Sequence, residues 1–234
     1  MHSREGEKQM GWRWLRRAPG GLFLPPAGQS QAGALGVLSG TFNPPTCAHF
    51  LLAAEAARQL ALDEILFVLP ETPPHKGKIE APLEDRAEML LCAIAAEPRF
   101  SAAVCDRGLL TEIHQALAPH YASSLRTIFL LGRDAAERIL VRWPYPDPKQ
   151  AMADMFSRFE MGVADRNGRF ALPAGLPAAR YSGKIHALWL PPEAGTISSS
   201  RVRVQAGAGN SLEGLVAPEV AAYIKLKCLY VAGH

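Results

Sequence analysis

The sequence predicts an α/β protein in which helices cover both faces of a parallel sheet. Three observations carry this prediction: 48% of the 234 residues are hydrophobic, short apolar runs alternate with helical patterns, and turns rich in Gly, Pro and Asn separate them. A chain of this length and composition forms one ordinary globular domain with a sizeable core. In such a fold, ligands bind at the carboxyl ends of the parallel strands.

The predicted elements follow one another from Ala34 onward. The apolar run 34–38 is the first strand, and after a turn the Ala- and Leu-rich stretch 48–60 is the first helix. The same apolar character predicts further strands at 64–69, 100–105, 127–131, 159–164 and 185–190. Helical patterns predict further helices at 83–96, 110–118, 199–206 and 218–226.

Charge divides the chain into an extension and a body. Residues 1–33 hold five cations and two anions, which leaves 20 of each sign in residues 34–234. A neutral body argues against nucleic acid as a partner, because such binding relies on clustered Lys and Arg. The absence of an apolar run near the ~20 residues of a membrane span argues against a membrane partner. We expect 1–33 to be a flexible basic extension and 34–234 to be the folded domain.

The cysteines indicate the compartment. Cys47, Cys92, Cys105 and Cys228 lie far apart and form no metal-binding spacing with histidines. This usage predicts reduced thiols, no protein-held metal site and a cytoplasmic location.

The sharpest functional signal is the segment 39–49, which follows the first predicted strand and opens the first predicted helix. Gly40 allows a tight turn and a close approach of the backbone to a ligand. Thr46 and His49 are three residues apart and therefore share a face of the first helical turn. The N–H groups and dipole at such a helix start favour an anion.

This segment resembles the G-x-F-x-P-x-[HT]-x-x-H signature of the nucleotidyltransferase superfamily, and most closely the nicotinate-mononucleotide adenylyltransferases. Further segments agree in order and spacing: 69–76, Arg86, the G-x-D turn 132–134, Trp143, and the I-S-S-S-x-V-R run 197–203. The resemblance extends from Leu35 to Tyr230. It implies a Rossmann-like fold of the nucleotidyltransferase type for residues 34–234.

The resemblance also implies roles for individual residues. It implies catalysis by His49, Thr46 and Arg203, and nucleotide binding by Gly40, Thr41, Phe42, Asp134, Ser198, Ser199 and Ser200. Lys76 and Glu112 are the candidates for binding the acceptor. ATP would be a substrate, and Mg²⁺ would be held mainly by its phosphate oxygens. We interpret Arg86 as a surface ion pair and Trp143 as a packing residue.

One stretch departs from the family pattern. The family's S-Y-T-x-D-T-L stretch, which recognises the pyridine mononucleotide, falls near 108–114, where we align only Glu112 with one of its polar groups. Because a site loses discrimination when its hydrogen-bonding partners are lost, the acceptor stays open. The first hypothesis is an adenylyltransferase acting on nicotinate or nicotinamide mononucleotide. The alternatives are an adenylyl- or cytidylyltransferase with another phosphorylated acceptor, and a nucleotide-binding module without turnover. A homo-oligomer is also open.

Overall fold

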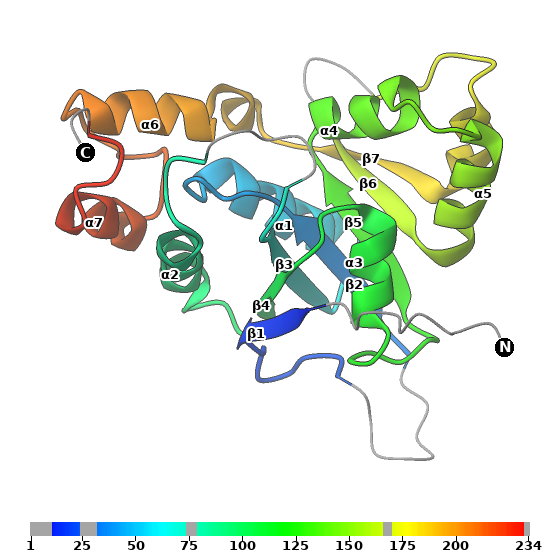
Figure 1. Cartoon of the computed structure of the whole chain (residues 1–234), viewed down its shortest axis with the longest axis horizontal. Helices are drawn as coiled ribbons and strands as arrows, with labels where there is room; N and C mark the ends of the chain where they lie inside the picture. The colour runs from blue at the N-terminus through cyan, green and yellow to red at the C-terminus, as the bar shows by residue number, and fades with distance from the viewer. Residues whose placement is uncertain (1–10, 24–31, 74–78, 166–169, 232–234) are drawn as a thin grey trace, which may run out of the picture.

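The structure is a computed structural model that describes residues 11–23, 32–73, 79–165 and 170–231 (Figure 1). Seven strands form one sheet in the order β1-β4-β3-β2-β5-β6-β7. The strands are β1 (Trp12–Arg16), β2 (Ala34–Ser39), β3 (Glu64–Pro70), β4 (Phe100–Cys105), β5 (Arg126–Leu131), β6 (Glu160–Asp165) and β7 (Ile185–Trp189). Strands β2 to β7 are parallel, and β1 is antiparallel to β4.

Helices cover both faces of the sheet, as Figure 1 shows. α1 (Cys47–Leu60) and α2 (Leu83–Ile94) pack on one face, and α3 (Leu110–Leu117) and α5 (Pro148–Arg158) pack on the other. α6 (Ser199–Gly207) and α7 (Pro218–Leu226) form a third hydrophobic cluster against α2. α4 (Arg133–Glu137) and the π-helical turn η1 (Arg138–Arg142) follow β5, while the 3-10 segments η2 (Pro177–Lys184) and η3 (Pro192–Thr196) flank β7.

The core is built from alternate residues of the strands. Leu35 and Val37 of β2 face the α3 and α5 side, whereas Leu38 faces the α1 and α2 side. Both faces are therefore buried, which explains why the strands read as continuous apolar runs in the sequence. The strand order places β2 at the centre, with β3 and β5 on either side. The crossovers diverge there, and this switch point is where ligands bind in open α/β sheets.

The structure confirms the predicted α/β fold. Each predicted strand end lies within one residue of the observed one, and each predicted helix end within two. α4, α5 and the 3-10 segments were not predicted. The signal for α5 was present, because Pro148 stands at its first turn and the Asp147 side chain accepts hydrogen bonds from the N–H groups of Lys149 and Gln150.

The expectation of a flexible extension is wrong for residues 11–23. Trp12–Arg16 form β1 at the edge of the sheet, and Ala18 and Leu22 are buried. The physical reason is that an extended, aromatic-rich segment pairs with the edge of β4, which would otherwise expose unpaired backbone groups. Within the described part of the chain, no helix is long and apolar enough to cross a bilayer.

Candidate active site

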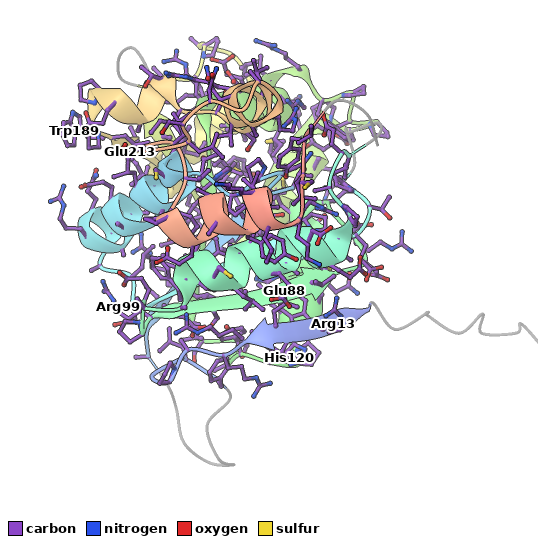
Figure 2. The ribbon with its side chains drawn as sticks, turned by 90° about the vertical axis from the view of Figure 1, so that its left-hand side faces the viewer. Arg13, Glu88, Arg99, His120, Trp189 and Glu213 are labelled. Atoms are coloured by element: carbon purple, nitrogen blue, oxygen red, sulfur yellow. The ribbon has the colours of Figure 1, made fainter. Side chains whose placement is uncertain are left out.

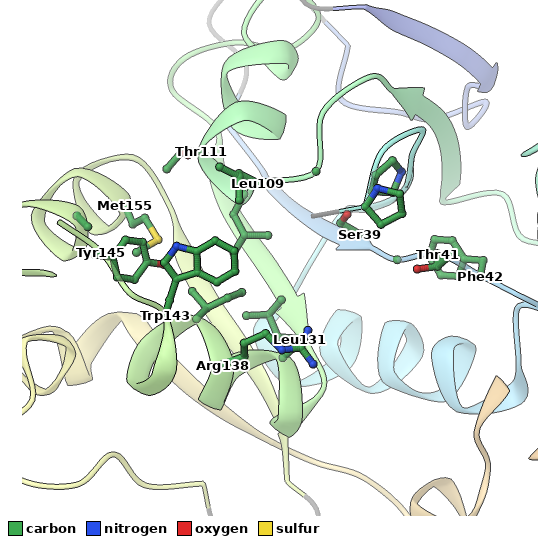
Figure 3. Close-up of a pocket in the computed structure, with 18 of the residues that line it drawn as sticks. Ser39, Thr41, Phe42, Leu109, Thr111, Leu131, Arg138, Trp143, Tyr145 and Met155 are labelled. Carbon is green, nitrogen blue, oxygen red and sulfur yellow. The ribbon is translucent and has the colours of Figure 1, made fainter. Parts of the chain in front are cut away.

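A pocket of about 430 Å³ opens at the carboxyl ends of the central strands. At one side lie residues that end or follow β2 or that begin α1 and α6: Ser39, Gly40, Thr41, Phe42, His49 and Ser199. At the other side lie residues at the start of α3, in η1 and just after it, and in α5, among them Leu109, Thr111, Arg138, Trp143, Tyr145 and Met155 (Figure 3). We call these two sides the phosphate side and the aromatic side.

The loop on the phosphate side turns directly at the end of β2. The N–H of Gly40 donates to the carbonyl of Val68 at 3.1 Å, which continues the pairing with β3. A Cβ at position 40 would lie 3.2 Å from the ring of Phe42, so glycine allows this ring to fold beneath the loop. Phe42 has a left-handed φ of 46° and is only 2% exposed. Its ring packs edge-on to the His49 imidazole, with 5.1 Å between the ring centroids.

His49 is oriented by the residue that precedes α1. Its Nδ1 accepts the backbone N–H of Thr46 at 3.0 Å, and the Thr46 Oγ1 lies 2.8 Å from the same nitrogen. A nitrogen that accepts an N–H carries no proton, so the neutral imidazole bears its proton on Nε2. His49 lines the pocket, whereas Thr46 is 1% exposed and lies beneath it. The geometry thus gives Thr46 the role of orienting His49 from below.

The serine run at the start of α6 uses its three hydroxyls differently. Ser198 caps the helix, because its Oγ accepts the N–H of Arg201 at 3.2 Å. Ser199 lines the pocket and donates to the carbonyl of Pro44 at 2.8 Å. The Ser200 Oγ lies 3.4 Å from a guanidinium nitrogen of Arg203. The contact of Ser199 brings the starts of α1 and α6 together around one cavity.

Arg203, on α6 just after the serine run, contacts the same loop. Its guanidinium donates to the carbonyl of Asn43 at 2.9 Å and pairs with the Glu80 carboxylate at 3.0 Å. Asn43 in turn donates to Glu80 at 2.5 Å and accepts the hydroxyl of Tyr230 at 2.9 Å. Burial raises the pKa of Glu80, but a backbone hydrogen bond and the neighbouring Arg203 and Asn43 outweigh it, so the pKa is lowered. Glu80 is therefore a carboxylate that holds Arg203.

The structure places three other predicted residues away from the pocket wall or outside the described chain. Asp134 is exposed in the first turn of α4, while Ala135 and Ile139 of the same turns line the pocket. Glu112 lines a neighbouring hollow that shares Gly108, Leu109 and Trp143 with the pocket. Its carboxylate accepts the N–H of Leu109 at 3.1 Å at the start of α3. Lys76 lies outside the described residues.

The interpretation of Arg86 as a surface ion pair is wrong. Arg86 is 3% exposed, and its guanidinium donates to the carbonyl of Thr41 at 2.8 Å. It supports the phosphate-side loop from inside the protein. The spacing of Arg86, Ala87 and Leu90 on the buried face of α2 was the signal that could have placed it. Trp143, which we interpret as a packing residue, packs near Tyr145 and also lines the pocket.

The aromatic side also contains residues that sequence reasoning missed. Thr111 lines the pocket within the stretch that departs from the family pattern, and Tyr145 lies with its ring centroid 6.1 Å from that of Trp143. Burial raises the pKa of Tyr145 to about 12, so its hydroxyl stays protonated. Arg138 is exposed and reaches the pocket from the turn after α4 (Figure 3). The only carboxylate among the described lining residues, Asp154, is paired with Arg158 at 2.7 Å.

The sequence of this chain matches a known protein family over the residues that build the pocket. The family profile described as cytidylyltransferase-like matches residues 37–205. The chain belongs to this cytidylyltransferase-like family and is a nucleotidyltransferase.

The relatives narrow the class further and confirm the resemblance found in the sequence. Proteins of Bordetella pertussis (31% identity, 84% of this chain and 97% of the relative) and Gloeobacter violaceus (33%, 84% and 95%) are described as probable nicotinate-nucleotide adenylyltransferases. The structure of Plasmodium falciparum nicotinic acid mononucleotide adenylyltransferase complexed with NaAD has the same fold. Its TM-score is 0.61 at 16% identity, with 85% of this chain and 97% of that chain covered.

Proposed function

We propose that this chain transfers the adenylyl group of ATP to nicotinate mononucleotide and releases pyrophosphate, as a step in NAD biosynthesis. The observation that carries the proposal is the shared pocket. His49 and Ser199 lie on its phosphate side, and the rings of Trp143 and Tyr145 lie on its aromatic side. The first side suits a polyphosphate, and the second suits a flat heterocycle. The names of the relatives support this choice of substrates.

The reaction needs positioning and charge stabilisation more than covalent chemistry by the protein. A phosphate oxygen of the acceptor attacks the α-phosphorus of ATP, and pyrophosphate leaves. The hydrogen bond at Nδ1 fixes the tautomer of His49 that carries its proton on Nε2. This Nε2–H donates a hydrogen bond to the phosphate oxygens, on which negative charge develops in the transition state. The starts of α1 and α6 add backbone N–H groups and helix dipoles near the same charge. Glu80 and Asn43 hold Arg203 close to this side.

Mg²⁺ is part of the proposal as a companion of the nucleotide. Among the described residues, no three His, Cys, Asp or Glu side chains gather where they could hold one ion. An ion bound mainly by phosphate oxygens would fit this donor set and would supply positive charge that offsets the charge on the pyrophosphate. The residues of this chain would bind and orient the phosphates around it.

The acceptor assignment rests on charge as well as shape. Arg138 faces the pocket, and the only described carboxylate there is already paired. A cation on the aromatic side favours an anionic acceptor, and nicotinate carries a ring carboxylate that nicotinamide lacks. The four cysteines are free thiols, which supports a cytoplasmic setting for this chemistry.

The test is pyrophosphate release by the purified protein with Mg²⁺. ATP or CTP is combined in turn with nicotinate mononucleotide, nicotinamide mononucleotide and other phosphorylated acceptors. Formation of a dinucleotide from ATP and nicotinate mononucleotide supports the proposal. Release only with CTP or with another acceptor supports the second hypothesis, and ATP binding without release supports a binding module.

Replacing Arg138, the cationic side chain at the pocket, should affect the two pyridine mononucleotides differently. We expect Arg138→Ala to raise the KM for nicotinate mononucleotide by about 10-fold or more, because a charge-assisted hydrogen bond contributes about 1.5–3 kcal/mol. The KM for nicotinamide mononucleotide should change less. Arg142→Ala is the matched control, since Arg142 lies on the same turn but pairs with Glu137 at 3.0 Å. Equal rises for both acceptors would place Arg138 at the acceptor phosphate.

A further inference from the structure

Strand β1 and the residues after it contact the rest of the domain through both backbone pairing and side-chain hydrogen bonds. It pairs along β4, with Trp12 opposite Cys105 and Trp14 opposite Ala103. The chain that follows it is anchored as well: the Ala18 N–H donates to the Ser101 Oγ at 2.9 Å, and the Leu22 N–H donates to the buried Glu64 carboxylate at 2.6 Å. Segment 11–23 is thus an integral edge of the domain. Figure 2 shows β1 along this edge, with Arg13 and His120 beside it.

The first contact that brings this segment near the active site lies just beyond the end of β4. The N–H of Asp106 donates to the carbonyl of Gly11 at 3.0 Å, just beyond the last residue of β4. A single residue, Arg107, then separates Asp106 from Gly108, which lines the pocket. The antiparallel pairing therefore extends almost to the pocket wall.

The second contact is at the far end of α3. Trp12 stacks on His120 with 5.5 Å between centroids, and Trp14 packs against the same imidazole at 5.4 Å. Next to it, the Tyr121 hydroxyl donates to the buried Glu64 carboxylate at 2.9 Å. His120 follows α3 by three residues, since the helix ends at Leu117. The strand therefore contacts the chain both before and after α3.

Between these two contacts lies one wall of the pocket. Gly108, Leu109, Leu110 and Thr111 all line it, and they form the start of α3 and the turn before it. Their positions depend on where the end of β4 and the end of α3 are held. β1 contacts both, although it precedes the family match at residues 37–205.

We propose that β1 is a positioning element that sets the acceptor-binding wall of the active site. This inference rests on the proposed function, because it takes the 108–111 wall as part of the acceptor site. β1 touches neither substrate. It acts through the Gly11–Asp106 hydrogen bond and through the packing of Trp12 and Trp14 on His120. The phosphate side is built on β2, α1 and α6, and β1 pairs with β4 rather than with β2.

The sharpest test changes one backbone N–H in the middle of β1. Because Gly11 and Asp106 form a hydrogen-bonded pair, the alternation of an antiparallel ladder makes Arg13 and Val104 the next such pair. Arg13→Pro removes that N–H and breaks the ladder. Arg13→Ala is the matched control, because it keeps the backbone and removes only an exposed side chain.

We expect Arg13→Pro to raise the KM for the acceptor about tenfold relative to Arg13→Ala. A change of this size corresponds to the loss of one or two hydrogen bonds that hold the wall in position. The KM for ATP should stay within about twofold of the control, since the phosphate side lies on other elements. Amide hydrogen exchange of residues 106–111 should be faster in the proline variant. Gly11→Ala is a second variant, since its Cβ would lie 3.3 Å from the Cβ of Asp106 and displace that residue with the ladder retained.

Two results overturn the proposal. One is an unchanged acceptor KM in a folded Arg13→Pro protein, or in Gly11→Ala if the proline variant does not fold. The other is an equal rise in both KM values together with a lower Tm, which indicates a purely structural strand. Failure of the proposed function is distinguishable, because then the wild-type protein itself would form no dinucleotide from either pyridine mononucleotide.

Discussion

His49→Ala is expected to lower kcat by about 10²–10³-fold, which is the usual effect of removing one donor that stabilises charge in a transition state. The reason lies in the tautomer. The Thr46 N–H at 3.0 Å occupies Nδ1, so the imidazole presents an Nε2–H from a wall of the pocket. Steady-state kinetics with saturating ATP and acceptor measures the effect, and the Tm should stay close to that of the wild type.

Two further variants divide the roles of the imidazole. His49→Asn places an amide oxygen near the position of Nδ1, so it keeps an acceptor for the Thr46 N–H but lacks a donor at the position of Nε2. His49→Gln places an amide N–H near Nε2. We expect the asparagine variant to be as slow as alanine and the glutamine variant to recover part of the activity. Wild-type turnover in His49→Ala would remove this residue from the mechanism.

Arg203→Ala is expected to weaken ATP binding by about 10- to 100-fold, the range for losing a hydrogen bond to a charged group. The structure adds a control that the sequence did not offer. Glu80 pairs with Arg203 at 3.0 Å, and in Glu80→Gln the amide oxygen can still accept from the guanidinium, which also keeps its contact with the Asn43 carbonyl. The substitution therefore keeps Arg203 in place and removes only the negative charge that competes with phosphate for it. Calorimetric titration with ATP and Mg²⁺ should show equal or tighter binding by Glu80→Gln.

Other outcomes for the ATP Kd of these two variants would change the role assigned to Arg203. An unchanged Kd in Arg203→Ala would mean that its contacts with Asn43 and Glu80 only brace the loop. Weaker binding in Glu80→Gln as well would mean that the ion pair positions Arg203 for the phosphates. Both variants leave the core intact, because Arg203 and Glu80 are partly exposed, with side-chain exposures of 25% and 49%.

Local spacing in the sequence was sufficient for the parallel sheet and for the phosphate-side loop. The continuous apolar runs of β2 to β5 have the pattern of strands buried on both faces, and Gly40 with His49 marked a turn into a helix start. That turn meets the serine run through the contact of Ser199 with Pro44, 155 residues away in the chain. Such a meeting is what the two motifs require, because two helix starts that bind one polyphosphate must face one another.

The sequence by itself determined the sheet, the helices that cover it, and the two loops that form the phosphate side. Only the tertiary structure decided that Arg86 is buried under the loop, that Glu112 caps a helix outside the main pocket, and that residues 12–16 complete the sheet. The physical reason is that periodicity records which residues share one element's face, whereas burial of a charge or pairing of an edge depends on which distant element packs there. For β1 that element is β4, about 90 residues later in the chain.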